Sequence, residues 1–108
     1  MALTITTSDR EGAHIVHVQG EVDLYTSPEL RKAILDALRT SRDLQLDLRS
    51  VAYMDSSGVA TLVEGLKTAG KSQCRFRLLA PSNAVTKVLQ LSRLDSVFDI
   101  LPGESGTA

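Results

Sequence analysis

The sequence predicts a single α/β domain with a mixed, mostly parallel sheet and helices packed mainly on one face. A chain of 108 residues suits one hydrophobic core. The expected elements follow the order ββαβαβαβ, and a helix between two strands implies parallel pairing through a short right-handed crossover. The inner strands alternate apolar with polar residues, whereas a doubly wound sheet has continuous apolar strands. We therefore expect one face of the sheet to be covered and the other to be wet.

The first two strands are predicted to form a hairpin. Residues 3–7 and 15–19 have strand character, and the Asp-Arg-Glu-Gly run at residues 9–12 supplies turn chemistry. The second strand has apolar side chains on both sides, so we expect it in the middle of the sheet and not at an edge.

The first helix is predicted from its start signals. Ser27 is the expected N-cap, Pro28 occupies the first helical position, and Glu29 places an acid in the first turn. Apolar residues then recur at helical spacing, and the helix should end near Thr40.

The remaining elements alternate between strand and helix. Residues 44–48 form the third strand, followed by a helix with an apolar stripe and Gly70 as its expected C-cap. Residues 75–78 form the fourth strand, a third helix begins at Ser82, and residues 97–101 form a last short strand. The polar residues predicted on the wet face are Gln45, Asp47, Arg75 and Arg77. The domain should span residues 1–101, with 102–108 as a short flexible tail.

Composition excludes several classes of function. The formal net charge is -1, so no global field attracts nucleic acid or an anionic membrane. The single cysteine, Cys74, excludes an intramolecular disulfide and suits a reducing compartment. No apolar run approaches a membrane span, and the N-terminus lacks signal-peptide features. We expect a cytoplasmic protein that does not insert into a membrane and carries no metal.

Enzymatic chemistry has little support in the residues. No glycine-rich phosphate loop follows a strand. His14 and His17 are three residues apart on one strand, so they point to opposite faces, and neither is placed to act as a base for Ser56. We interpret both as structural or surface residues, and Cys74 as a small buried apolar residue. The protein is not expected to be an enzyme or to hold a cofactor.

The stretch AYMDSSGVATLVEGL at residues 52–66, unlike the residues above, contains a candidate functional site. Asp55 or Ser56 alone could cap the helix that follows, with a contribution of about 1 kcal/mol. One cap needs one side chain, however, and Gly58 in the first turn lowers helix propensity by about 1 kcal/mol relative to alanine. We expect Gly58 to leave an open surface where another molecule approaches the backbone. A hydroxyl phosphorylated here would lie at the positive end of the helix dipole. The residues alone leave capping and modification as alternatives.

Two segments resemble the signatures of a known family. GEVDLYTSPEL at residues 20–30 and DLRSVAYMDSSGVATLVEGL at residues 47–66 are similar to those of the anti-sigma factor antagonists, whose fold is called the STAS domain. The element order resembles that fold over about residues 3–101.

The resemblance implies a site and a mechanism. Ser56 is implied as the phosphoacceptor of a partner that is both an anti-sigma factor and a serine kinase and that carries the ATP. The unphosphorylated protein would bind this partner and release a sigma factor, and a serine phosphatase would reset the switch. The implied docking surface consists of Asp23, Thr26, Ser27, Asp55, Ser57 and Gly58. Leu24 and Tyr25 either fill a gap above the first helix or contact the partner.

Other functions stay open at this point. The same domain resembles small accessory subunits of membrane transport complexes, including phospholipid ABC transporters, where it acts as a scaffold. An antagonist that has lost phosphorylation is a third possibility. An aspartyl-phosphate receiver is disfavoured because the first strand is not followed by the paired acids that bind magnesium.

Overall fold

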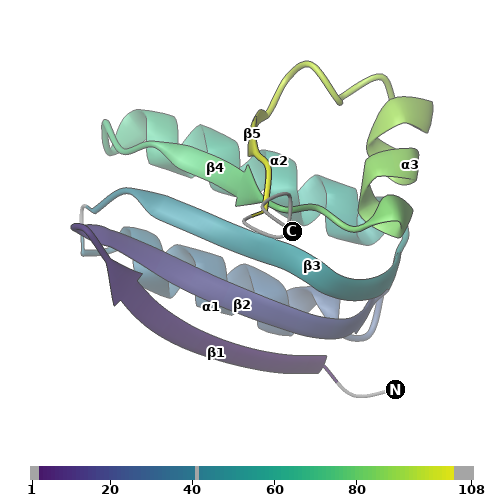
Figure 1. Ribbon diagram of the computed structural model, residues 1–108, viewed down its shortest axis with the longest axis horizontal. Coiled ribbons are helices and arrows are strands. Elements are labelled where there is room, and N and C mark those ends of the chain that lie inside the picture. Colours follow the sequence, from purple (N-terminus) through teal and green to yellow (C-terminus); the bar gives the residue numbers. More distant parts are fainter. Residues whose placement is uncertain (1–2, 41, 104–108) are drawn as a thin grey trace.

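The computed structural model describes residues 3–40 and 42–103. The described residues form one sheet of five strands and three helices: β1 (Leu3–Arg10), β2 (Ala13–Val22), α1 (Ser27–Leu38), β3 (Leu44–Met54), α2 (Ser56–Lys71), β4 (Phe76–Leu79), α3 (Asn83–Leu91) and β5 (Asp99–Leu101). The strands lie in the sheet in the order β1-β2-β3-β4-β5 (Figure 1). β1 is antiparallel to β2, and the other neighbours are parallel. The predicted mixed sheet, its element order and the central place of β2 are confirmed.

The hairpin is longer than predicted. β1 and β2 stay paired up to Arg10 and Ala13. Glu11 and Gly12, between them, both have positive φ, 52° and 86°. Two positive φ values are typical of the tight type I′ turn, whose twist matches that of an antiparallel pair. Asp9 therefore lies in β1 and not in the turn.

α1 and α2 lie behind the sheet in Figure 1, and the core fills the space between them and β2, β3 and β4. α3 packs against the part of β3 that extends beyond the short β4. There the backbone N–H of Ser82 donates to the Leu48 carbonyl at 3.2 Å, and the Ser82 hydroxyl donates to the Val51 carbonyl at 2.7 Å. The predicted start of this helix is confirmed, because the Ser82 side chain caps it by accepting from the Val85 N–H.

Two predicted helix caps are wrong by one or two residues. The N-cap of α1 is Thr26, and Ser27 is its first helical residue. α1 ends at Leu38 with Arg39 as its C-cap, in agreement with the predicted end near Thr40. Gly70 lies inside α2, whose C-cap is Ser72.

β3 continues six residues beyond the predicted end at Leu48. The alternation of buried and exposed residues breaks after Leu48, because the register between β2 and β3 shifts between His17 and Gln19 and again after Gly20. The fourth and fifth strands are also displaced slightly, to Phe76–Leu79 and Asp99–Leu101.

The face of the sheet opposite α1 and α2 is less wet than predicted. Asp47 is only 6% exposed, and Gln45 and Arg77 are half-buried, whereas Arg75 is exposed. Pro102 and Gly103 have no regular secondary structure, and the rest of the predicted tail, residues 104–108, lies outside the described residues.

Candidate functional site

Two polar loops lie side by side where β2 and β3 end. Val22 and Met54 are the last paired residues of these parallel strands. The next peptide group continues the contact, because the backbone N–H of Asp55 donates to the Val22 carbonyl at 3.1 Å. The loop after β2 begins with Asp23, and the loop after β3 with Asp55. The two segments singled out in the sequence are thus joined by one strand pairing.

Asp55 is the N-cap of α2. Its Oδ1 accepts from the backbone N–H of Ser57 at 2.9 Å and of Gly58 at 3.4 Å. The Ser57 hydroxyl also donates to this oxygen, at 2.5 Å. A capping carboxylate satisfies N–H groups that have no partner inside the helix. Asp55 and Ser57 therefore hold the start of α2 in one conformation.

Ser56 is the first residue of α2 and is exposed. In the part of the chain that the structure describes, its hydroxyl has no hydrogen-bond partner, whereas the hydroxyl of half-buried Ser57 is engaged by Asp55. Capping falls to Asp55 and not to Ser56, so the Ser56 hydroxyl is left available at the positive end of the helix dipole.

Asp23 organises the neighbouring loop in a similar way. Its Oδ1 accepts from the backbone N–H of Tyr25 at 2.9 Å and of Thr26 at 3.0 Å. The bond from the Thr26 N–H is the main cause that holds the pKa of the Asp23 carboxyl below its usual value. The Thr26 hydroxyl accepts from the Asp23 N–H at 2.9 Å and donates to the Glu21 carbonyl at 2.8 Å. Asp23 and Asp55 are both half-buried, and both carboxylates lie at the edge of the sheet where β2 and β3 end.

Three of the residues implied as docking residues are buried: Thr26, Ser27 and Gly58. The expectation that Gly58 leaves an open surface is wrong. A Cβ at this position would lie 2.6 Å from Met54 Cγ and 2.8 Å from Val22 Cγ1. The glycine is required because α2 packs closely on the ends of β2 and β3. Thr26 is buried and stabilises the loop after β2 through its hydrogen bonds. The exposed part of the implied docking surface is therefore formed by other residues.

Exposed apolar side chains flank the two loops. Leu24 is 70% exposed and Tyr25 is 89% exposed, so neither fills a gap above α1. Tyr53, near the end of β3, is 48% exposed and lies opposite Glu21 in the strand pairing. The sequence interpretation missed Tyr53 because it ended the third strand too early. An aromatic residue two positions before the capping aspartate was the available signal.

The other candidate groups lie elsewhere. His14 contacts Asp9, and His17 contacts Asp47 on the opposite face of the sheet. Cys74 is half-buried rather than fully buried, next to the core at the start of β4. Among the described residues, no three His, Cys, Asp or Glu side chains converge as metal ligands would. None of the helices described is both long enough and apolar enough to cross a membrane.

Comparisons with known sequences agree with this fold. The family model described as "Mlab, STAS domain" matches residues 5–102. The anti-sigma-B factor antagonist of Staphylococcus aureus (strain NCTC 8325 / PS 47) is 30% identical over 105 residues, which cover 95% of this chain and 96% of that protein.

Solved structures show the same architecture. An anti-sigma factor antagonist from Mycobacterium paratuberculosis is similar with a TM-score of 0.86 and 29% identity, covering 97% of this chain and 90% of that one. The Bacillus cell fate determinant SpoIIAA in its phosphorylated form is similar with a TM-score of 0.68 and 24% identity, covering 98% and 96%. This second likeness concerns the fold alone.

Proposed function

The chain belongs to the STAS domain family, and from this premise we propose that it is an anti-sigma factor antagonist switched off by phosphorylation of Ser56. In the unphosphorylated state it binds an anti-sigma factor that is also a serine kinase, and the sigma factor is released. The observation that carries this proposal is the position of Ser56. Its hydroxyl is exposed and unbonded among the described residues, at a helix start that Asp55 already caps.

The local geometry supports Ser56 over Ser57 as the phosphoacceptor. In the transfer, the Ser56 hydroxyl loses its proton and takes the γ-phosphoryl group of ATP bound to the kinase, and ADP leaves. Ser57 would first have to give up its 2.5 Å bond to Asp55, which helps to order the cap. A phosphate on Ser56 lies at a helix N-terminus, where the dipole and backbone N–H groups favour negative charge. The modification is therefore compatible with the fold.

The surface around Ser56 supports protein binding. Leu24, Tyr25 and Tyr53 expose large apolar side chains beside the half-buried carboxylates of Asp23 and Asp55. Aromatic and aliphatic anchors with a polar surround are typical of interfaces. The matching partner surface has apolar recesses for these side chains and approaches the neutral Ser56 hydroxyl closely.

Phosphorylation would weaken this interface electrostatically. The phosphate adds about 1.5 to 2 negative charges beside Asp55. A partner surface that fits the neutral Ser56 hydroxyl must then desolvate the phosphate without a cation to pair with it. A loss of about 1.4 kcal/mol lowers affinity tenfold, and mismatched charges at an interface cost several kcal/mol. A separate serine phosphatase resets the switch.

Phosphorylation with candidate anti-sigma kinases tests the proposal. The protein is incubated with each kinase and ATP, and the modified residue is mapped by mass spectrometry. We expect phosphate on Ser56 in the wild-type chain and in Ser57→Ala, and none in Ser56→Ala. Phosphate on Ser57 alone would contradict the assignment. Absence of phosphorylation together with co-purification of a membrane ATPase would favour the accessory-subunit function instead.

A further inference from the structure

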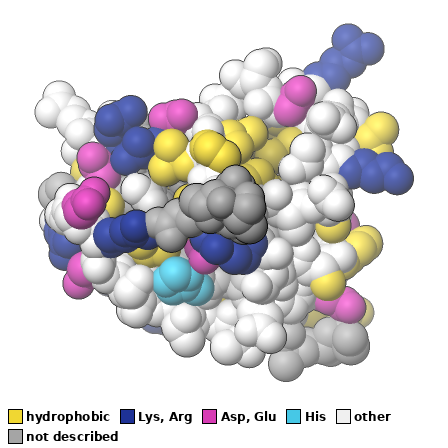
Figure 2. Space-filling view, viewed as in Figure 1, with side chains coloured by type: hydrophobic (Ala, Val, Ile, Leu, Met, Phe, Trp, Pro, Cys, Tyr) yellow, Lys and Arg dark blue, Asp and Glu magenta, His cyan; other side chains and the backbone are white. Residues whose placement is uncertain are grey.

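The face of the sheet turned away from α1 and α2 contains a cavity of about 380 Å³. It extends from the β1–β2 turn across β3 and β4 to the end of β5, and Arg10, Gln45, Arg49, Arg77 and Leu79 are among its lining residues. This volume lies in the range of small-molecule sites, about 300–1,000 Å³. Figure 2 views this face and shows Lys and Arg side chains over the middle of the sheet. The cavity is distinct from the surface around Ser56.

Arg77 in β4 contributes a buried hydrogen-bond donor to this cavity. Its Nε is buried and has no hydrogen bond among the described residues. Asp99 lies opposite Arg77 in the β4–β5 pairing, but its carboxylate contacts the Arg75 guanidinium, at 3.7 Å. A buried donor of a charged group is costly when nothing accepts from it. An acceptor in the cavity would remove this cost.

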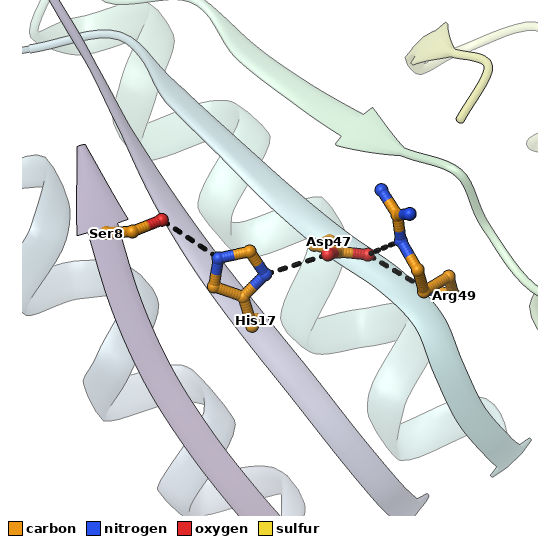
Figure 3. A network of polar contacts seen from close by, with 4 residues as sticks. All are labelled: Ser8, His17, Asp47 and Arg49. Carbon is orange, nitrogen blue, oxygen red and sulfur yellow. Dashed lines mark hydrogen bonds and ion pairs between the residues drawn. The ribbon is translucent and has the colours of Figure 1, made fainter. Parts of the chain in front are cut away.

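Arg49 in β3 presents a second guanidinium. Its Nε and its backbone N–H both donate to Asp47 Oδ1, at 3.0 and 3.1 Å. Asp47 is itself fixed by His17, whose Nδ1 lies 2.8 Å from Asp47 Oδ2. Figure 3 shows the two terminal nitrogens of Arg49 directed away from Asp47, on the side of β4. The Asp47 contact therefore orients the guanidinium and leaves its terminal N–H groups toward the cavity.

The charges around the cavity favour an anion at the Arg49 and Arg77 end. Glu11 and Asp43 also line the cavity, but both lie at its other end, beside the hairpin turn. Asp43 accepts there from the Arg75 backbone N–H at 2.9 Å. Planar guanidinium groups bind the oxygens of phosphate and carboxylate through paired hydrogen bonds.

We propose that this cavity binds a small phosphate-bearing molecule, with the phosphate between Arg49 and Arg77. Arg77 donates to it from the otherwise unpartnered Nε, and Arg49 donates from its terminal nitrogens. Gln45, which lies opposite Arg77 in the β3–β4 pairing, supplies a side-chain amide at the same place. This site goes beyond the proposed switch and does not depend on Ser56, Asp23 or Asp55.

A titration followed by backbone amide NMR tests this site in the full chain. Inorganic phosphate and glycerol 3-phosphate are added separately to the wild-type protein at constant ionic strength. We expect saturable shifts at Gln45, Arg49 and Arg77, and none at Ser56. Tighter binding of glycerol 3-phosphate would identify a phosphate ester as the ligand, whereas equal binding would identify free phosphate.

Variants of neighbouring arginines provide the matched comparison. Arg77→Met keeps most of the apolar stem and removes the guanidinium, and we expect it to weaken binding about tenfold or more. Arg49→Gln should weaken binding similarly. Arg75→Met removes an exposed arginine two residues away that does not line the cavity, and it should bind as the wild type does. Equal losses in Arg75→Met and Arg77→Met, or no saturable shift in the wild type, would overturn the proposal.

Discussion

At the scale of single residues, the strand-to-helix junction divides its tasks among neighbours. Asp55 caps α2, Ser57 braces the cap, and Gly58 lets the helix approach the sheet. Ser56 is the member of this run that serves none of these structural purposes among the described contacts. A hydroxyl that is not needed for folding can be modified without disturbing the residues beside it.

Substitution of the two glycines at the ends of α2 separates packing from helix propensity. Gly58→Ala should destabilise the protein by about 1–3 kcal/mol, because the new methyl group overlaps Met54 and Val22. Gly70→Ala is the matched control: a Cβ there meets no atom within 4 Å, so the better helix former should stabilise by up to about 1 kcal/mol. Urea unfolding measures both free energies. Equal changes in the free energy of unfolding for the two substitutions would show that the close packing at Gly58 does not exclude a side chain.

The sequence allowed Asp55 and Ser56 to be placed at the helix start, because capping residues act locally. It did not allow the role of Gly58 to be predicted, because the neighbours that exclude a Cβ come from β2 and from the end of β3. Leu24 and Tyr25 illustrate the same limit. Whether an apolar side chain after a strand is covered depends on elements that are distant in the sequence.

At the scale of secondary structure, a polar chain joins the three strands β1, β2 and β3. The Ser8 hydroxyl lies 2.9 Å from His17 Nε2, and His17 Nδ1 lies 2.8 Å from Asp47 Oδ2 (Figure 3). Burial of Asp47 by itself raises the pKa of its carboxyl. Hydrogen bonds from His17 and Arg49 outweigh that effect and hold the pKa below its usual value.

The pH dependence of the free energy of unfolding should reveal the contribution of Asp47 to this hydrogen-bond network. Because the pKa of Asp47 is lower in the folded state, its carboxylate stabilises the fold above the unfolded pKa of about 4 and loses this contribution as the pH falls through the folded value. Asp47→Asn should therefore be less stable than the wild type at pH 7 but lose less stability on acidification below about pH 4. Asp99→Asn, which removes an exposed carboxylate, is the matched control for the loss of one negative charge. Urea unfolding at a series of pH values measures the difference, and parallel curves for all three proteins would contradict this role of Asp47.

The order and type of the elements were predictable because apolar periodicity is a local signal. Strand lengths were not. The sequence pattern predicts an end of β3 at Leu48, because the shifts in its pairing with β2 depend on both strands and leave no local signal. The polar face was expected to be wet because Asp47 alternates with leucines, but its burial depends on His17 from β2 and on Arg49.

At the scale of the whole molecule, the proposed switch requires a change of surface charge and no change of fold. Asp23 and Asp55 are each fixed by backbone hydrogen bonds, and the strand ends that carry them are paired up to Val22 and Met54. Phosphorylation of Ser56 therefore requires no rearrangement of the backbone around Asp23 and Asp55.

Ser56→Ala and Ser56→Asp should fold equally well and bind differently. Because Ser56 is exposed, both substitutions should change the free energy of unfolding by only about 0.5 kcal/mol. Ser56→Ala should stay bound to the anti-sigma kinase in the presence of ATP, whereas Ser56→Asp should bind at least about tenfold more weakly. Calorimetric titration with the kinase measures the affinities, and equal affinities would refute the electrostatic mechanism.

The agreement between strand order in the sheet and strand order in the chain has a consequence for biosynthesis. Each strand that leaves the ribosome adds to an edge that already exists, and none has to be threaded between two partners that have already joined. The loop that carries Asp23 and the helix start that carries Ser56 are both complete once α2 has docked, before β4 and β5 have left the ribosome.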